Sequence, residues 1–91
     1  MMIHISELRG KTVMSTDGQM LGIVENVIIE PETGNLTKLK ILPSDEININ
    51  AFDLDQDKSI LLPFGCITSI KNVVVVELDK ATRALLEKQN L

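Results

Sequence analysis

Aromatic side chains are almost absent from this sequence, which has no Trp, no Tyr and two Phe. Proteins that bind single-stranded nucleic acids stack the bases on aromatic rings. The formal net charge is -4, whereas phosphate backbones bind to basic faces. The largest basic group is typical of a solvated face and consists of Arg9, Lys11, Lys38 and Lys40. Composition therefore predicts no direct binding of RNA or DNA.

Cysteine and histidine are equally scarce. Cys66 is the only cysteine and His4 the only histidine, so an internal disulfide is excluded. A Cys66–His4 pair has the chemistry of a nucleophilic dyad, which makes an enzyme using Cys66, or a ligand-binding barrel, the third class of function to weigh. No catalytic signature surrounds Cys66, and a free cysteine usually packs as a small hydrophobe. Two such ligands also do not close a zinc site. From this scarcity of reactive and metal-binding side chains we predict no catalytic residue, no metal and no cofactor.

Long apolar runs are also missing. No run approaches the roughly 18 residues that a transmembrane helix needs. The N-terminal residues lack the basic and apolar regions of a signal peptide. A chain of 91 residues is long enough for one compact core. We therefore expect a single domain over residues 1–91, without membrane insertion, in the cytoplasm.

One acidic cluster resembles a calcium-binding loop. Asp53, Asp55 and Asp57 have the spacing of the first three ligands of an EF-hand. The glycine that such a loop requires is replaced by Lys58, and the final glutamate is replaced by Phe64. The pattern favours a solvated loop and leaves open whether this loop binds a cation.

Turn residues divide the chain into short apolar runs. Ser6–Gly10 is typical of one helical turn that a glycine ends, and Asp17-Gly18 is a strong hairpin signal. The pattern predicts short strands at 11–14, 21–30, 36–42, 59–64, 67–70 and 73–76. In the second of these strands the apolar alternation is imperfect, which predicts a bend or a bulge near Glu25-Asn26.

The last part of the chain changes to a helical period. Asp79 can cap a helix over about 79–90, whose apolar stripe is predicted to be Leu78, Ala81 and Leu85. The run Val73–Val76 is apolar on both faces and needs cover on its outer side. Four apolar residues lie off the stripe or in the acidic loop, and they form the predicted interaction surface: Phe52, Leu54, Leu86 and Leu91. Such surplus apolar surface commonly binds a partner, so we expect a homodimer through the outer barrel face or the helix.

The turns and strands also form an ordered pattern over nearly the whole chain. It begins Ser6-x-Leu8-x-Gly10-Lys11-x-Val13, continues Asp17-Gly18-x-x-Leu21-Gly22-x-Val24-x-x-Val27, and includes Gly34, Leu39, Leu62-Pro63-Phe64, Ile67, Ile70 and the valine run. This pattern resembles the PRC-barrel family. The residues that would shape the fold are Gly10, Asp17, Gly18, Gly22, Gly34 and Pro63, with Gly22 at a bend or a close backbone approach.

The predicted fold is accordingly all-β. It is a small six-stranded antiparallel β-barrel of PRC type, with a short N-terminal helical turn and a C-terminal α-helix. The barrel occupies about 6–77 and the helix about 79–90. We expect a closed or half-closed barrel, because a sheet this small would otherwise leave its edges exposed.

The resemblance implies a protein-binding or scaffolding role. The family includes a cytoplasmic domain of the photosynthetic reaction centre, a domain of a bacterial ribosome-maturation factor, and free-standing archaeal proteins. Some of the archaeal proteins are adaptors of the cell-division apparatus. We expect a non-enzymatic adaptor of the free-standing type, linked to archaeal cell division. The alternative is an accessory factor in ribosome maturation or RNA processing that acts through a protein partner.

The acidic balance gives a first testable prediction. Titration with single-stranded and duplex oligonucleotides at low salt should show nothing tighter than about 10⁻⁴ M, the weak end of non-specific binding. Fluorescence anisotropy of labelled RNA and DNA measures this directly. Micromolar binding that weakens as salt is added would contradict the prediction.

Overall fold

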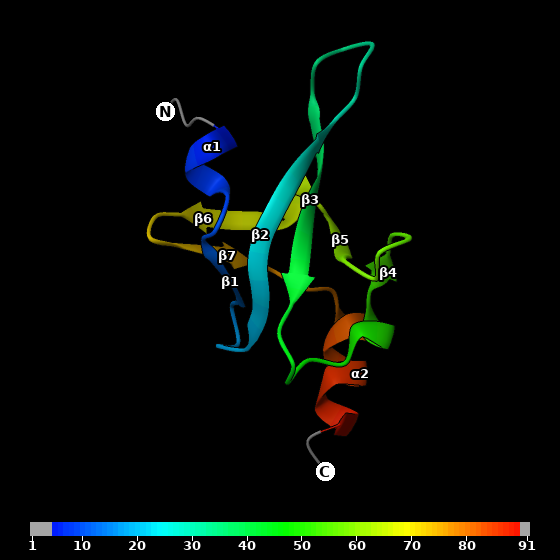
Figure 1. The fold of residues 1–91 in the computed structure, drawn as a ribbon. Coiled ribbons are helices and arrows are strands. Elements are labelled where there is room, and N and C mark those ends of the chain that lie inside the picture. The colour runs from blue at the N-terminus through cyan, green and yellow to red at the C-terminus, as the bar shows by residue number, and fades with distance from the viewer. Residues whose placement is uncertain (1–4, 90–91) are drawn as a thin grey trace.

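The computed structural model describes the backbone of residues 5–89 and side chains up to Leu86. Over this range the elements are α1 (Ile5–Leu8), β1 (Thr12–Ser15), β2 (Met20–Ile29), β3 (Leu36–Pro43), the 3-10 helix η1 (Ile49–Ala51), β4 (Asp53–Leu54), β5 (Ile60–Pro63), the 3-10 helix η2 (Phe64–Cys66), β6 (Ile67–Ile70), β7 (Val73–Val76) and α2 (Lys80–Gln89). In Figure 1, β2 and β3 form a long hairpin and β6 and β7 run across it, so the sheet curves strongly.

All seven of these strands belong to one mixed sheet. Its order is β4-β5-β3-β2-β1-β7-β6, and β1 pairs with β7 in parallel while the other pairs are antiparallel. The prediction of an all-β fold of PRC type is confirmed. The predicted six antiparallel strands are wrong in number and in direction, and of the two forms expected for the barrel the closed one is wrong. The short strand β4 follows an irregular polar segment, and the β1–β7 pair joins distant parts of the chain. Neither feature produces a local pattern of turns or alternation.

Two bulges in β2 explain its imperfect alternation. The register with β1 shifts at Leu21, and the register with β3 shifts at Glu25. Each extra residue lengthens the step between inward-facing positions from two residues to three. Leu21, Val24 and Val27 are consequently all buried. The bulge predicted near Glu25-Asn26 is confirmed, and it lets one long strand keep facing a curved core.

Gly22 permits the closest contact between β2 and β3. A Cβ atom at this position would collide with the backbone carbonyl oxygen of Leu42, and Gly22 has a φ of +154°, which L-residues rarely adopt. The obstacle is a backbone atom at the end of the β2–β3 ladder, held there by the Ile23–Leu42 pairing and by the bond from the Ser44 N–H to the Leu21 carbonyl, so it cannot rotate aside as a side chain could. The close approach expected at Gly22 is confirmed.

The core lies inside the curve of the sheet. Leu8 of α1 is 1% exposed and packs into this core. The presence of α1 confirms the helical turn predicted near Ser6–Gly10. Val74 and Val76 are fully buried, whereas Val73 and Val75 are half-buried. The full set of buried apolar side chains is Leu8, Val13, Leu21, Val24, Val27, Leu39, Ile41, Ile60, Leu62, Val74, Val76, Leu78 and Leu86.

The C-terminal helix forms but presents a different face from the predicted one. Leu78, just before α2, and Leu86 are each 4% exposed, and Thr82 between them is half-buried. Ala81 is exposed and Leu85 is 44% exposed. The predicted stripe is therefore confirmed at Leu78 and wrong at Ala81 and Leu85, and Leu86 belongs to the core rather than to a free surface.

Contacts at its first turn set the rotation of α2. The Thr82 N–H donates to Asp79 Oδ1 at 2.7 Å, which confirms Asp79 as the cap. Arg83 donates from Nε to the Leu78 carbonyl and from Nη2 to Glu77, both at 3.1 Å. These bonds hold Arg83 against the preceding segment, and this orientation turns Leu86 inward.

Replacing Gly22 tests the close strand contact. Gly22→Ala should lower the free energy of unfolding by about 3 kcal/mol or more, because crowding costs about 1–3 kcal/mol and the positive φ about 1–2 kcal/mol. Gly34→Ala is the control, since Gly34 also has a positive φ but no neighbouring atom within 4 Å of a Cβ. In urea unfolding, Gly34→Ala should lose only the cost of the positive φ, about 1–2 kcal/mol of the free energy of unfolding. Equal losses in the two variants would contradict the contact.

Candidate interaction surface

Exposed apolar side chains concentrate on the β2–β3 hairpin. Among the side chains that the structure describes, six large hydrophobic ones are exposed, and five of them lie on these two strands: Met20, Ile23, Ile28, Ile29 and Leu42. The sixth is Leu85 on α2. Sequence reasoning missed this group because the residues look like ordinary strand formers. Only the two bulges decide which of them face outward.

Ile23 and Leu42 form the centre of the candidate surface. They are direct partners across β2 and β3, so their side chains lie next to each other on the same face. Their exposed fractions are 39% and 53%, while Val24 and Ile41 beside them point into the core. A cross-strand pair of large apolar residues is thus displayed on a rigid part of the sheet.

An ion-pair network lies next to this apolar pair on the outer side of the sheet. Lys40 Nζ is 2.9 Å from Asp55, 3.2 Å from Glu25 and 3.4 Å from Asp57. Glu25 belongs to β2, Lys40 to β3, and the two aspartates to the loop between β4 and β5. Ser59 Oγ donates to Glu25 at 3.1 Å. The network therefore connects three separate parts of the chain.

Asp55 is the most strongly held member of the network. Its Oδ1 accepts the backbone N–H groups of Asp57 and Ser59, each at 2.9 Å. The hydrogen bond from Lys40 is the main cause that lowers the pKa of the Asp55 carboxyl. Hydrogen bonds to Asp55 and then Glu25 raise the pKa of Lys40 above its ordinary value. Asp55 and Lys40 are therefore both charged at neutral pH.

The acidic loop thus receives its counter-charge from Lys40 of β3. The ammonium group of Lys40 occupies the place between Asp55 and Asp57 where an ion would lie. Lys58, at the position of the EF-hand glycine, has a left-handed φ of 64°, so the turn forms without glycine. Asp53 is exposed on β4 and makes no ion pair within the described residues. In that part of the chain no group of His, Cys, Asp and Glu is arranged to hold a metal ion.

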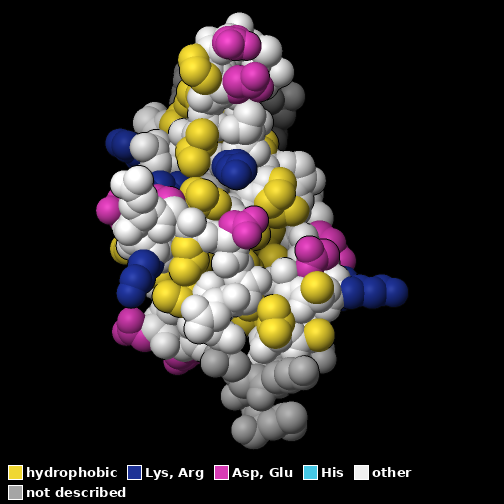
Figure 2. Space-filling view, turned by 90° about the vertical axis from the view of Figure 1, so that its right-hand side faces the viewer, with side chains coloured by type: hydrophobic (Ala, Val, Ile, Leu, Met, Phe, Trp, Pro, Cys, Tyr) yellow, Lys and Arg dark blue, Asp and Glu magenta, His cyan; other side chains and the backbone are white. Residues whose placement is uncertain are grey.

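The residues predicted as an interaction surface are not exposed where the structure describes them. Phe52 and Leu54 are half-buried and pack against the core. Leu86 is buried, as described above, and Leu91 lies outside the described residues. Figure 2, seen from the side of β4, β5 and α2, shows hydrophobic side chains in small groups among charged ones. The exposed Ile23–Leu42 pair is therefore a better-defined candidate.

The residues expected to shape the fold lie at turns and strand ends. Gly10, Gly18 and Gly34 have positive φ angles, and Pro63 is the last residue of β5. Asp17 lies in the β1–β2 turn, 3.8 Å from Arg83 of α2. None of these residues is on the outer face of β2 and β3.

Cys66 lies beside a small pocket. The pocket has a volume of about 220 Å³ and is lined by Leu62, Pro63, Cys66, Glu77, Leu78, Asp79 and Thr82. Burial raises the pKa of the Cys66 thiol, which lowers the fraction of reactive thiolate at neutral pH. His4, the other half of the considered dyad, lies outside the described residues.

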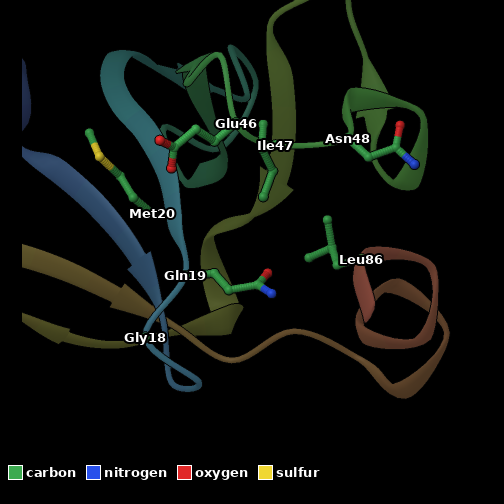
Figure 3. A pocket seen from close by; sticks show the side chains of 7 residues that line it. All are labelled: Gly18, Gln19, Met20, Glu46, Ile47, Asn48 and Leu86. Carbon is green, nitrogen blue, oxygen red and sulfur yellow. The ribbon is translucent and has the colours of Figure 1, made fainter. Parts of the chain in front are cut away.

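A second hollow of about 330 Å³ separates α2 from the sheet. Figure 3 shows Ile47 and Leu86 pointing toward it and Met20 turned away, and the full lining is Gly18, Gln19, Met20, Glu46, Ile47, Asn48 and Leu86. Glu46 is the one ionisable side chain in this lining. A catalytic acid–base pair would need a second such group.

The Lys40 network gives a prediction about cations. Lys40→Gln should lower the melting temperature, because Glu25, Asp55 and Asp57 then face one another without a counter-charge. Millimolar Ca²⁺ should raise it again, since carboxylate oxygens are calcium ligands. Lys38→Gln is the control, because Lys38 is exposed on the same strand and outside the network. A wild-type protein stabilised by Ca²⁺ as strongly as Lys40→Gln would contradict the prediction.

None of the helices in the described part of the chain has the length and apolarity to cross a membrane. An uncharacterized protein of the archaeon Methanocaldococcus jannaschii is 22% identical over 67 residues, which cover 74% of this chain and 72% of that protein. The crystal structure of RimM from Pseudomonas aeruginosa, assigned to 16S ribosomal RNA processing, superposes with a TM-score of 0.60 at 24% identity. That match covers 85% of this chain and 44% of RimM, so this chain spans less than half of that protein. The sequence profile of the PRC-barrel domain matches residues 1–83, and the chain therefore belongs to the PRC-barrel family.

Proposed function

We propose that this chain is a non-enzymatic adaptor in the cytoplasm, and that it binds a protein partner through the outer face of β2 and β3. The observation that carries the proposal is the exposed Ile23–Leu42 pair beside the Lys40 network. Exposed apolar groups with a polar rim are typical of protein interaction sites. The surface is also pre-organised, because strand pairing and ion pairs already hold its side chains in place.

A binding role fits the chemistry of the site better than catalysis. In the network one ammonium group, that of Lys40, contacts all three carboxylates, so the two groups with shifted pKa values, Lys40 and Asp55, are bound to each other. The thiol of Cys66 is made less reactive by burial. The larger of the two hollows is lined more by polar than by apolar surface, whereas small-molecule sites are predominantly apolar. These features support a surface that recognises another macromolecule by shape and apolar contact.

The cell-division apparatus of an archaeon is the proposed setting for the adaptor. Free-standing PRC-barrel proteins of archaea include adaptors of that apparatus, and the relative in Methanocaldococcus jannaschii is archaeal. This part of the proposal is supported by family membership and not by any feature of the surface.

A second candidate is an accessory role in ribosome maturation through a protein partner. The shared fold with RimM favours it. The two candidates differ in what the surface captures, since a ribosomal role requires a ribosomal protein among the partners. Co-sedimentation of the chain with ribosomal subunits would favour this second role.

Charge substitution on the outer face tests the adaptor proposal. Leu42→Glu should weaken capture of the partner about tenfold or more, because burying an unpaired charge at an interface costs at least the ~1.4 kcal/mol that a tenfold change represents. Both Leu42 and the control position Leu85 are exposed, so Leu42→Glu and Leu85→Glu should melt like the wild type. Quantitative mass spectrometry of proteins captured from the source cells by each variant gives the comparison.

The expected pattern is loss of specific partners with Leu42→Glu and Ile23→Glu and their retention with Leu85→Glu. If only Leu85→Glu lost the specific partners, the binding site would be assigned to α2 instead of the outer face of β2 and β3. Retention by all three variants would show that neither exposed apolar site binds the partner, and would refute the proposal.

A further inference from the structure

Acidic residues are unevenly distributed along this acidic chain. It has 13 Asp and Glu residues, yet none between Ile60 and Val76, where Lys71 is the one charged residue. This span contains β5, η2, β6 and β7. β7 and β6, which lie together at one end of the sheet, therefore carry no negative charge that would repel a second copy of the chain.

β6 is also a free edge of the sheet, interrupted by a bulge at Thr68. β4 and β6 are the two edge strands. β4 has only two residues, begins with Asp53 and is followed by Asp55, and short charged edges resist pairing with another strand. β6 has four residues, Ile67–Ile70, without charge or proline. Among residues 5–89 it pairs with β7 alone.

The two ends of β6 differ in charge. Lys71 follows its last residue, and Lys11 donates from Nζ to the Lys71 carbonyl at 2.7 Å, so two ammonium groups belong to this end. At the other end Cys66 precedes β6, and its carbonyl accepts the N–H of the exposed Glu77 at 2.8 Å. The Glu77 carboxylate contacts Arg83, which also lies 3.8 Å from Asp17, so these three groups together give this end a net negative charge. In an antiparallel pair of β6 strands, the basic end of each copy lies beside the acidic end of the other.

We propose that β6 pairs in antiparallel fashion with β6 of a second copy, which makes the chain a two-fold dimer with a continuous sheet. The uncharged strand is compatible with itself, and its ends are complementary. The dimer goes beyond the adaptor role and uses a different part of the molecule from the outer face of β2 and β3. A partner could bind that face on each copy of the dimer.

Thr68 is the position at which the pairing can be tested. It is exposed and is the extra residue at the register shift between β6 and β7. Its Oγ1 donates to the Val75 carbonyl at 3.2 Å. Because it lies near the middle of β6, two-fold symmetry places it close to Thr68 of the second copy.

Light scattering after gel filtration at micromolar concentration is the experiment. The wild type should have about twice the chain mass of 10.1 kDa, and Thr68→Glu and Thr68→Lys should each run as monomers because like charges meet at the axis. An equimolar mixture of the two variants should regain the dimer mass, since opposite charges then meet. Thr33→Glu in the exposed β2–β3 turn is the control and should remain a dimer.

A wild-type mass near that of one chain at all concentrations would overturn the proposal. So would a dimeric Thr68→Glu, or a loss of the dimer in Thr33→Glu, which would assign the effect to net charge. Amide hydrogen exchange provides a test on the wild-type protein alone. Protection of the amides of residues 67–70 should fall as the protein is diluted. Protection that does not depend on concentration would also overturn the pairing. Partner capture by Leu42→Glu is a separate measurement, so failure of the dimer and failure of the adaptor role are distinguishable.

Discussion

The pairing of β2 with β3 is the constraint on which the rest of the fold depends. It is the longest strand pair of the sheet, and it requires a backbone contact at Gly22 and Leu42 that no side chain permits. Its bulge at Glu25, together with the bulge opposite β1, keeps inward positions of β2 facing a curved core. Curvature, rather than closure, is how this small sheet surrounds its apolar side chains.

The same bulges decide the outer surface of the molecule. Since Val24 and Ile41 face inward, Ile23 and Leu42 face outward together, and Lys40 lies over Glu25. The ion pairs fix the β4–β5 loop against the sheet and form the polar border of the apolar pair. The proposed partner surface and the free β6 edge thus occupy different parts of one sheet, so the two proposed contacts do not compete for the same residues.

Local features of the fold could be read from the sequence by itself. Asp17-Gly18 specified a hairpin, Asp79 a helix cap, and the broken alternation a bulge near Glu25, because each depends on the conformational preferences of a few adjacent residues. The ordered set of turns was also sufficient to indicate the PRC-barrel family, to which the chain belongs. The composition determined the acidic charge and the poverty of aromatic and nucleophilic groups.

Features that depend on residues far apart in the sequence were decided only by the tertiary structure. The parallel pair of β1 and β7, the burial of Leu86 and the position of Lys40 among three carboxylates all connect segments far apart in the chain. No local periodicity encodes such contacts: the rotation of α2 was set by Arg83 bonds to the preceding segment, and the outward side of β2 by its bulges. The sequence therefore determined most of the elements and the family, while the packing of those elements determined which apolar and charged groups remain available for binding.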